Sequence, residues 1–251
     1  MVVVGAGRVG TALKARAEAQ GAPCHLVSRS EGWEVFEETD PTPILLAVRN
    51  DALGAVVDRI PPARHGDLVF IQNGMIRPWL ADRGLEAATR GLLFFAVPER
   101  GAPLQPGGVN PFTGPRAGAL VAWFQALGLE AEEVSPTRFA EVELEKLLWN
   151  SIFGLMCQAH GADVGTICDT HDEELAGLVD ELRRVGEGPL EVQLAQGPLV
   201  ERLCAYSRTI PRYTGAVKEW PWRNGWFVEA ARTQGIATPV HDRLLRAIGR
   251  A

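Results

Sequence analysis

The chain has 251 residues with a formal net charge of −6 at pH 7, and 46% of its residues are apolar. Acidic and basic residues are interspersed, which argues against a nucleic-acid or polyanion partner. No apolar run approaches the roughly 20 residues of a membrane span, and no charged leader precedes the first apolar segment. We therefore expect a cytoplasmic protein that acts on a small molecule, and we leave open whether it is a homodimer.

The first twenty-one residues contain an apolar segment, a glycine-rich turn and a helical segment closed by a glycine. Gly5, Gly7 and Gly10 fit the pattern G-x-G-x-x-G of dinucleotide-binding proteins. Gly5 allows the tight turn, Gly7 lets a pyrophosphate approach the backbone, and Gly10 lets helix and strand pack closely. Arg8 and Val9 begin the helix, whose amide groups and dipole favour phosphate. The alternative is a Rossmann-like fold whose binding site is vestigial.

The end of the second expected strand, "CHLVSRS", bears on the choice of cofactor. An NAD site normally has Asp or Glu there to bind the ribose hydroxyls. This chain has Ser28, Arg29 and Ser30, and a cation between two hydroxyls suits a 2′-phosphate. We therefore predict NADP as the cofactor, the alternative being that Arg29 is a surface residue without a ligand.

Further apolar segments alternate with helical ones up to about residue 97, which predicts an α/β fold with a doubly wound parallel sheet of the Rossmann type. Arg49, Asn50, Asn73 and Gly74 follow two of these strands, at the sheet edge where such folds bind ligands. We expect Asn73 to face the ligand, although Asn-Gly is also an ordinary turn former. Residues 98–118 are dense in Pro and Gly and predict an irregular loop, followed by a helix and a last short strand.

A hinge is expected near Ser135–Thr137, because proline restricts the residue before it and ends regular structure. We predict an NADP-binding Rossmann domain over 1–135 and a smaller, all-helical substrate and catalytic domain over 136–251. Its helices are expected over 138–160, 172–196, 198–210, 224–235 and 239–250.

Lys146 and Asn150 lie four residues apart on the first of these helices and therefore share a face. Apolar residues cover most of the rest of that helix, and a lysine in such surroundings is costly unless it is paired. Two explanations remain open: Lys146 lines a ligand site between domains, or its amine reaches solvent at a domain edge.

Two further groups of residues have both a structural and a functional interpretation. Cys157 and His160, and likewise Cys168 and His171, form C-x-x-H pairs that could bind zinc, but buried thiols and surface histidines are favoured and no metal is expected. The other group consists of Trp220, Trp222 and Trp226; core or interface packing is favoured there over a ligand cage.

Several motifs, taken together and in order, resemble the ketopantoate reductase (2-dehydropantoate 2-reductase, ApbA/PanE-like) family. They are "GAGRVG", "QNGM", "EKLLWN" and "KEWPWRNGWFVEAARTQGIATP", with Ser207 twelve residues before Glu219. The resemblance covers most of the chain. It implies a catalytic lysine at Lys146 and an acidic partner at Glu219. It further implies three substrate-binding residues, Asn73, Asn150 and Ser207, and two basic cofactor contacts, Arg29 and Arg49.

The resemblance implies an NADPH-dependent reductase of a small 2-keto acid, an enzyme of pantothenate biosynthesis. Hydride transfer from nicotinamide C4 leaves negative charge on the carbonyl oxygen, and Lys146 would act as the general acid. Partial desolvation would lower the pKa of Lys146 towards neutrality, and Glu219 would raise it again.

Two departures put the exact substrate in question. The segment 98–118 replaces the hairpin of the family. A further asparagine that the family places after Asn150 to hold substrate hydroxyls has no counterpart, and Gly154 stands near one such position. Two alternatives therefore remain: a related dehydrogenase acting on an imine or a β-hydroxy acid, and a non-catalytic NADP-binding regulator or scaffold.

Overall fold

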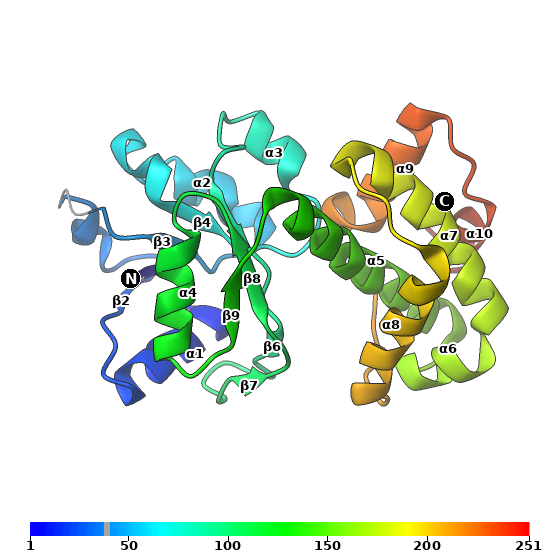
Figure 1. Ribbon diagram of the computed structural model, residues 1–251, viewed down its shortest axis with the longest axis horizontal. Helices are drawn as coiled ribbons and strands as arrows, with labels where there is room; N and C mark the ends of the chain where they lie inside the picture. Colours follow the sequence, from blue (N-terminus) through cyan, green and yellow to red (C-terminus); the bar gives the residue numbers. More distant parts are fainter. Residues whose placement is uncertain (38–40, 251) are drawn as a thin grey trace. The chain divides into compact units, whose positions relative to one another are not determined.

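The computed structural model describes residues 1–37 and 41–250, so residues 38–40 and 251 of the expected domains lie outside it. The chain divides into two compact units, Met1–Phe139 and Ala140–Ala251 (Figure 1). The expected boundary at 135/136 falls at the start of helix α5 (Pro136–His160), four residues before this division.

The first unit is built on a seven-stranded sheet with the order β2-β1-β3-β4-β5-β8-β9. The strands β1 to β5 are parallel, β8 is antiparallel to β5, and β9 is parallel to β8. The predicted Rossmann-type sheet is confirmed, with its last two strands reversed. The strands are β1 (Val2–Val4), β2 (His25–Val27), β3 (Ile44–Leu46), β4 (Leu68–Phe70), β5 (Thr89–Gly91), β8 (Asn110–Thr113) and β9 (Ala131–Glu133).

Helices α1 (Arg8–Ala19) and α4 (Ala117–Ala126) cover one face of this sheet (Figure 1). Val3, Leu45 and Val69 of three central strands pack there against Leu13 and Phe124 of the two helices. Because successive strand residues point to opposite faces, their neighbours Val4, Leu46 and Phe70 are buried on the other face of the sheet. Helices α2 (Leu53–Val57) and α3 (Arg77–Ala81) follow β3 and β4, and three 3-10 turns lie at Trp33–Glu37, Asn50–Ala52 and Pro62–Asp67.

The prediction of an irregular loop without a hairpin over 98–118 is wrong. Strands β6 (Phe95–Ala96) and β7 (Gln105–Pro106) form a short antiparallel pair, and β8 belongs to the main sheet. Asn110 anchors this region: its side chain accepts a bond from the Phe94 amide at 2.7 Å and donates to the Glu130 carbonyl at 2.7 Å. Its amide group thereby supplies contacts that the Pro- and Gly-rich sequence does not suggest.

The second unit is all-helical over its described residues, 140–250, as predicted. Two details differ from expectation. A short helix, α6, was not predicted, and the helix expected over 172–196 ends at Leu190, where Glu191 adopts a left-handed conformation with φ 53°. Besides α5, the helices are α6 (Val164–Thr170), α7 (Asp172–Leu190), α8 (Gln196–Thr209), α9 (Asn224–Gln234) and α10 (Pro239–Ala247), with a 3-10 turn, η4, at Trp220–Trp222.

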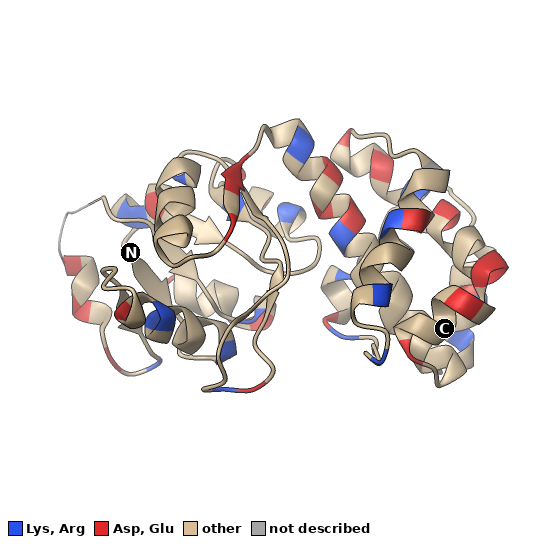
Figure 2. Ribbon diagram, turned by 60° about the horizontal axis from the view of Figure 1, so that its bottom comes forward, with Lys and Arg blue, Asp and Glu red and all other residues tan. Residues whose placement is uncertain are grey.

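Positions of basic and acidic residues are interspersed along the helices of this unit (Figure 2). Among the helices that the described residues form, none is both long and apolar enough to cross a membrane.

We expect Gly10→Ala to destabilise the protein much more than Gly7→Ala. A Cβ on Gly10 would lie 1.9 Å from the Gly5 carbonyl oxygen, whereas one on Gly7 would meet nothing within 4 Å. Overpacking of this kind costs about 1–3 kcal/mol, and an unhindered substitution stays within about 0.5 kcal/mol. Urea unfolding of the two variants would measure the difference. Equal stabilities would show that the close contact does not restrain the turn.

Candidate functional site

The glycine turn connects β1 to α1 and is held from both sides by neighbouring strands. Gly5 has φ +118°, a conformation that favours glycine, and its amide donates to the Val27 carbonyl at 2.8 Å. A Cβ on Gly5 would also lie 2.5 Å from the Ala47 carbonyl oxygen. Gly7, by contrast, caps α1 beside open space. The turn therefore leaves backbone amides accessible at a helix start, the arrangement that binds phosphate.

This turn borders a cavity of about 640 Å³. Of the predicted cofactor residues, Gly5, Gly7, Ser28 and Arg29 line it. The glycine turn and the end of β2 therefore line one cavity, as expected. Its size is typical of small-molecule sites.

Three arginines line the cavity: Arg29, which the sequence predicts as a cofactor contact, and Arg59 and Arg100, for which the sequence carries no such signal. The Arg59 guanidinium lies 3.8 Å from the centroid of the Trp33 ring and donates to the Arg29 carbonyl at 3.0 Å. The Trp33 indole donates in turn to the Ser28 carbonyl at 2.8 Å. These contacts fix the loop after β2. Arg59 escaped prediction because it lies thirty residues away from Arg29 along the chain.

Other predicted cofactor residues lie outside the cavity lining. Arg8 donates to the Pro98 carbonyl at 3.2 Å, Val9 packs partly into the core, and Gly10 lies beneath the turn. The side chain of Arg49 is 83% exposed and forms an ion pair with Asp51 at 2.7 Å. The placement of Arg49 beside the cofactor phosphates is therefore not supported, because a carboxylate two residues away already binds it.

Asn73 and Gly74 form a turn at the carboxyl end of β4, where Gly74 has φ +93°. The buried side chain of Asn50 donates to the Asn73 carbonyl at 2.9 Å. Buried Gln72 donates to the carbonyls of Leu46, at 2.6 Å, and of Val48. Two amide side chains thus tie the ends of β3 and β4 together, while the Asn73 side chain is exposed.

In the second unit, Lys146 is a partly buried residue of α5. Burial, helped by the positive charge of Arg223, lowers the pKa of its amine from 10.5 to about 7. The expected lowering by desolvation is therefore present. Asn150 donates from Nδ2 to the Lys146 carbonyl at 2.9 Å, so its amide plane is fixed one turn along the helix.

Glu219 stands at the start of η4 in a left-handed conformation with φ 49°. Such strain in a residue other than glycine persists only where its surroundings enforce it, and it is concentrated at functional sites. An oxygen of Glu219 lies 2.6 Å from Nη2 of buried Arg223. The pKa of Lys146 was expected to rise because of Glu219. Instead the carboxylate is paired with Arg223, whose own charge lowers that pKa.

The predicted substrate-binding role of Ser207 is not supported by its position. Ser207 is 0% exposed on α8. Its hydroxyl accepts a bond from the Trp149 indole at 3.0 Å and donates to the Leu203 carbonyl at 2.9 Å. Ser207 lies within the last turns of α8, which ends at Thr209. Its side chain is on the buried side of that helix.

The cysteines do not assemble a metal site with their C-x-x-H histidines. Cys157, Cys168 and Cys204 are buried free thiols, and Cys24 is partly buried. Cys168 lies beside Cys204, whose side chain, together with burial, raises the pKa of the Cys168 thiol. The tryptophans at 220, 222 and 226 are partly exposed, with the ring of Trp226 edge-on to buried Phe227 at 5.0 Å.

Neither a protein-family model nor a curated protein matches the chain. Solved structures do. A PanE/ApbA family ketopantoate reductase from Ralstonia eutropha JMP134 matches with a TM-score of 0.77 and 18% identity, over 99% of this chain and 97% of that one. This chain has the ketopantoate reductase fold.

Two other structures with this fold are similarly close. A 2-dehydropantoate 2-reductase from Methylococcus capsulatus has a TM-score of 0.76 and 20% identity, over 99% of this chain and 95% of that one. A D-mandelate dehydrogenase, solved with NADH, has a TM-score of 0.76 and 14% identity, over 99% and 97%. The fold implied by the motifs is thus confirmed by these structures. The chemistry of the protein has to be inferred from its own residues.

We expect Lys146→Met to stabilise the protein at neutral pH. The folded-state pKa, about 7, lies below the ordinary 10.5, so the unfolded chain binds the proton more tightly. The resulting penalty is fully present below pH 7 and disappears as the pH rises towards 10.5. Because Lys146 is partly exposed, the gain should be about 2 kcal/mol, less than the full shift implies.

Urea unfolding at several pH values would measure this gain, with Lys218→Met as the matched control. Lys218 is exposed, so its replacement should change the free energy of unfolding by less than about 0.5 kcal/mol. A Lys146→Met variant no more stable than this control would mean that the amine is well solvated.

Proposed function

We propose that the protein is an NADPH-dependent reductase of a small 2-keto acid, with Lys146 as general acid. The observation that carries this proposal is a lysine on a largely apolar helix whose pKa is lowered to about 7, in a chain with the ketopantoate reductase fold. A neighbour of the same fold, D-mandelate dehydrogenase, has been solved with NADH and anilino(oxo)acetate. The activity is consistent with both kinds of neighbour.

The cavity beside the glycine turn fits a nicotinamide dinucleotide. The open space at Gly7 allows a pyrophosphate to approach the start of α1. Arg29, Arg59 and Arg100 line the other part of the cavity, and among residues 1–37 and 41–250 no carboxylate lines it to bind free ribose hydroxyls. Guanidinium groups bind phosphate strongly, which favours NADP over NAD.

The proton chemistry follows from the pKa of Lys146. NADPH, when bound, supplies the hydride. A general acid works best when its pKa is near the working pH, and an amine with a pKa of about 7 meets this condition. Its positive charge would stabilise the negative charge that develops on the carbonyl oxygen, and Nζ would then donate the proton.

Arg223 and Glu219 would support this acid in different ways. The guanidinium of Arg223 favours loss of the lysine proton, which makes Lys146 a stronger acid. It also holds the carboxylate of Glu219 at 2.6 Å in its strained backbone position. We assign Arg223 as a positioning residue and Glu219 as the acidic group that works with Lys146 and the substrate.

The substrate is proposed to be a 2-keto acid with an apolar side chain, not ketopantoate itself. A Cβ on Gly154 would lie 2.8 Å from the Ala216 carbonyl oxygen, so no asparagine fits there to hold hydroxyls. The hydroxyl of Ser207 is already occupied. Trp149, three residues after Lys146, contacts the exposed rings of Tyr206 and Tyr213 and offers an apolar neighbour.

NADPH oxidation should occur with one or more apolar 2-keto acids in a spectrophotometric screen. Lys146→Ala should lower kcat by about 10²–10⁴-fold, the usual contribution of a general acid. The wild-type rate should be high below pH 7 and fall as the pH rises through the lysine pKa, about 7, because the ammonium donates the proton.

Lys218→Ala is the control for this experiment and should retain activity. NADPH binding without turnover of any keto acid would favour the cofactor-binding regulator or scaffold. Turnover that survives Lys146→Ala would identify another acid.

Arg59→Ala should weaken NADPH binding by about 10–100-fold, because a hydrogen bond between charged groups contributes about 1.5–3 kcal/mol. NADH binding should change little. Arg83→Ala is the matched control, since Arg83 also lies over a tryptophan, Trp79, at 4.8 Å from its ring centroid, but does not line the cavity. Calorimetric titration with each nucleotide would measure both affinities. An equal loss for NADH and NADPH would contradict recognition of the 2′-phosphate by Arg59.

A further inference from the structure

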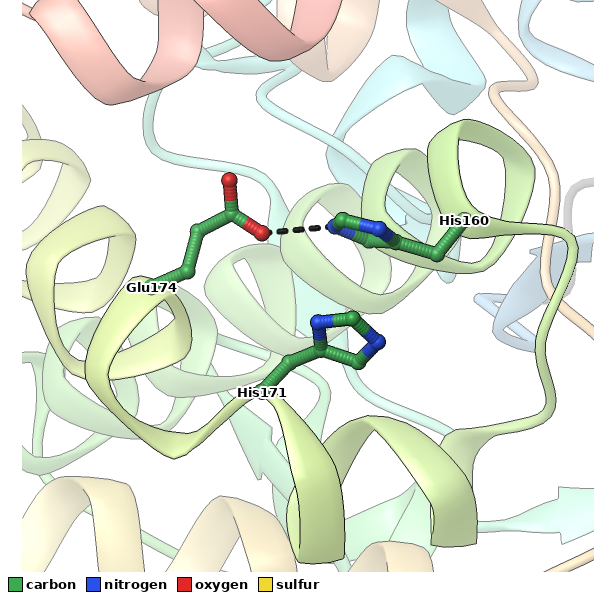
Figure 3. Close-up of side chains that lie close together, drawn as sticks. All are labelled: His160, His171 and Glu174. Atoms are coloured by element: carbon green, nitrogen blue, oxygen red, sulfur yellow. Dashed lines mark hydrogen bonds and ion pairs between the residues drawn. The ribbon is translucent and has the colours of Figure 1, made fainter.

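A second group of chemically active side chains lies in the helical unit, apart from the residues proposed for catalysis. His160 ends α5, His171 precedes α7, and Glu174 lies in the first turn of α7. One ligand atom from each residue lies within 4.8 Å of the other two. Figure 3 shows the two imidazole rings one above the other, with a nitrogen of each directed towards the carboxylate of Glu174.

A hydrogen bond joins His160 to Glu174, and His171 contacts the group by ring stacking. Nε2 of His160 lies 2.6 Å from Oε2 of Glu174. The His171 ring stacks on the His160 ring with centroids 4.0 Å apart and planes inclined by 29°. Its nitrogens form no hydrogen bond with any residue in 1–37 or 41–250. One imidazole therefore keeps its lone pair available at the edge of the cluster.

The three side chains form a donor set that suits a divalent cation. Neutral imidazole is the form that binds metal ions, and two imidazoles with one carboxylate are a known zinc donor set. The carboxylate would supply negative charge that offsets part of the charge of a divalent ion.

Glu174 is also oriented by a residue outside the group. Its other oxygen, Oε1, lies 2.7 Å from Nη2 of Arg243 on α10. Ligating carboxylates are commonly fixed in this way by a hydrogen bond to the oxygen that does not bind the metal. Oε2 is thereby held on the side of the two imidazoles.

We propose that His160, His171 and Glu174 bind a divalent transition-metal ion of the Zn²⁺ type, with water completing a four-coordinate site. Imidazole and carboxylate ligands suit Zn²⁺ and exclude ions that need thiolates. The ion would link the end of α5 to the start of α7. His160 lies fourteen residues after Lys146, or about 21 Å along the helix axis, so the site is structural and separate from the proposed reduction.

The cysteines of the two C-x-x-H pairs take no part in this site. Cys157 and Cys168 are 1% and 6% exposed and belong to the hydrophobic core, while their histidines reach the surface cluster. The Co²⁺-loaded protein can therefore be distinguished from one with a cysteine-containing site by its absorption spectrum. Thiolates bound to Co²⁺ give charge-transfer absorption, and imidazoles and carboxylates do not.

Isothermal titration of the metal-free full-length protein with Zn²⁺ tests the proposal. Wild type should bind one ion, and His171→Ala and Glu174→Gln should each weaken binding at least about 10-fold. His65→Ala is the matched control and should bind as wild type does, since His65 bonds to the Ile60 carbonyl elsewhere in the chain. Glu174→Gln preserves the size of the side chain and serves if His171→Ala fails to fold.

Titration of wild type with Co²⁺ provides a second readout that needs no variant. A four-coordinate visible spectrum without thiolate charge transfer is expected. Absence of stoichiometric Zn²⁺ binding, binding unchanged in both cluster variants, or a thiolate band would each overturn the proposal. Keto-acid reduction by His171→Ala should equal that of wild type, so the two proposals fail independently.

Discussion

The contact between Gly5 and Gly10 is the constraint on which the first unit depends. The Gly5 carbonyl oxygen occupies the place where any side chain on Gly10 would stand. This contact lets α1 begin at Arg8, only four residues after β1 ends, so that the turn residues Gly5, Ala6 and Gly7 line the cavity beside the helix start. Ser28 and Arg29 line the same cavity as this tight turn. The close approach of Gly5 and Gly10 thus packs the helix against the strand and also leaves the turn open to a ligand.

A different balance governs the helical unit. Lys146 and Arg223 carry like charges, and burial adds to the cost of keeping the lysine protonated. Glu219 lies against Arg223 and offsets part of that cost at the guanidinium, not at the amine. Lys146 is therefore easily deprotonated, whereas Arg223 beside it stays charged. Functional sites often contain neighbouring ionisable groups whose pKa values their surroundings have shifted apart.

The sequence predicted the features that depend on local pattern. The strand, glycine turn and helix at the N-terminus, the parallel order of the first strands and the all-helical second half all follow from periodicity and glycine spacing. The fold suggested by the motifs agrees with the solved neighbours. The desolvation of Lys146 also followed from the apolar residues around it on one helix.

Features that depend on long-range contacts escaped prediction. Arg59 reaches the cavity through a stack on Trp33, whereas Arg49, whose side chain pairs with Asp51, is not among the residues that line it. Ser207 lies on a helix that the sequence predicts, but its burial and its contacts with Trp149 and Leu203 do not follow from a spacing counted along the chain. The side chain of Asn110 on β8 links the start of the β6–β7 hairpin, through the Phe94 amide, to the Glu130 carbonyl before β9, and turn statistics do not reveal these contacts.

The glycine at 154 ties α5 closely to the segment around residue 215. Gly215 packs against it from the opposite segment, and a Cβ on Gly215 would lie 2.9 Å from the Phe153 carbonyl oxygen. Two glycines therefore face each other, and neither can acquire a side chain while the other segment stays in place. A larger residue at 154 therefore requires the backbone around 215 to move as well, so the two positions can change only together.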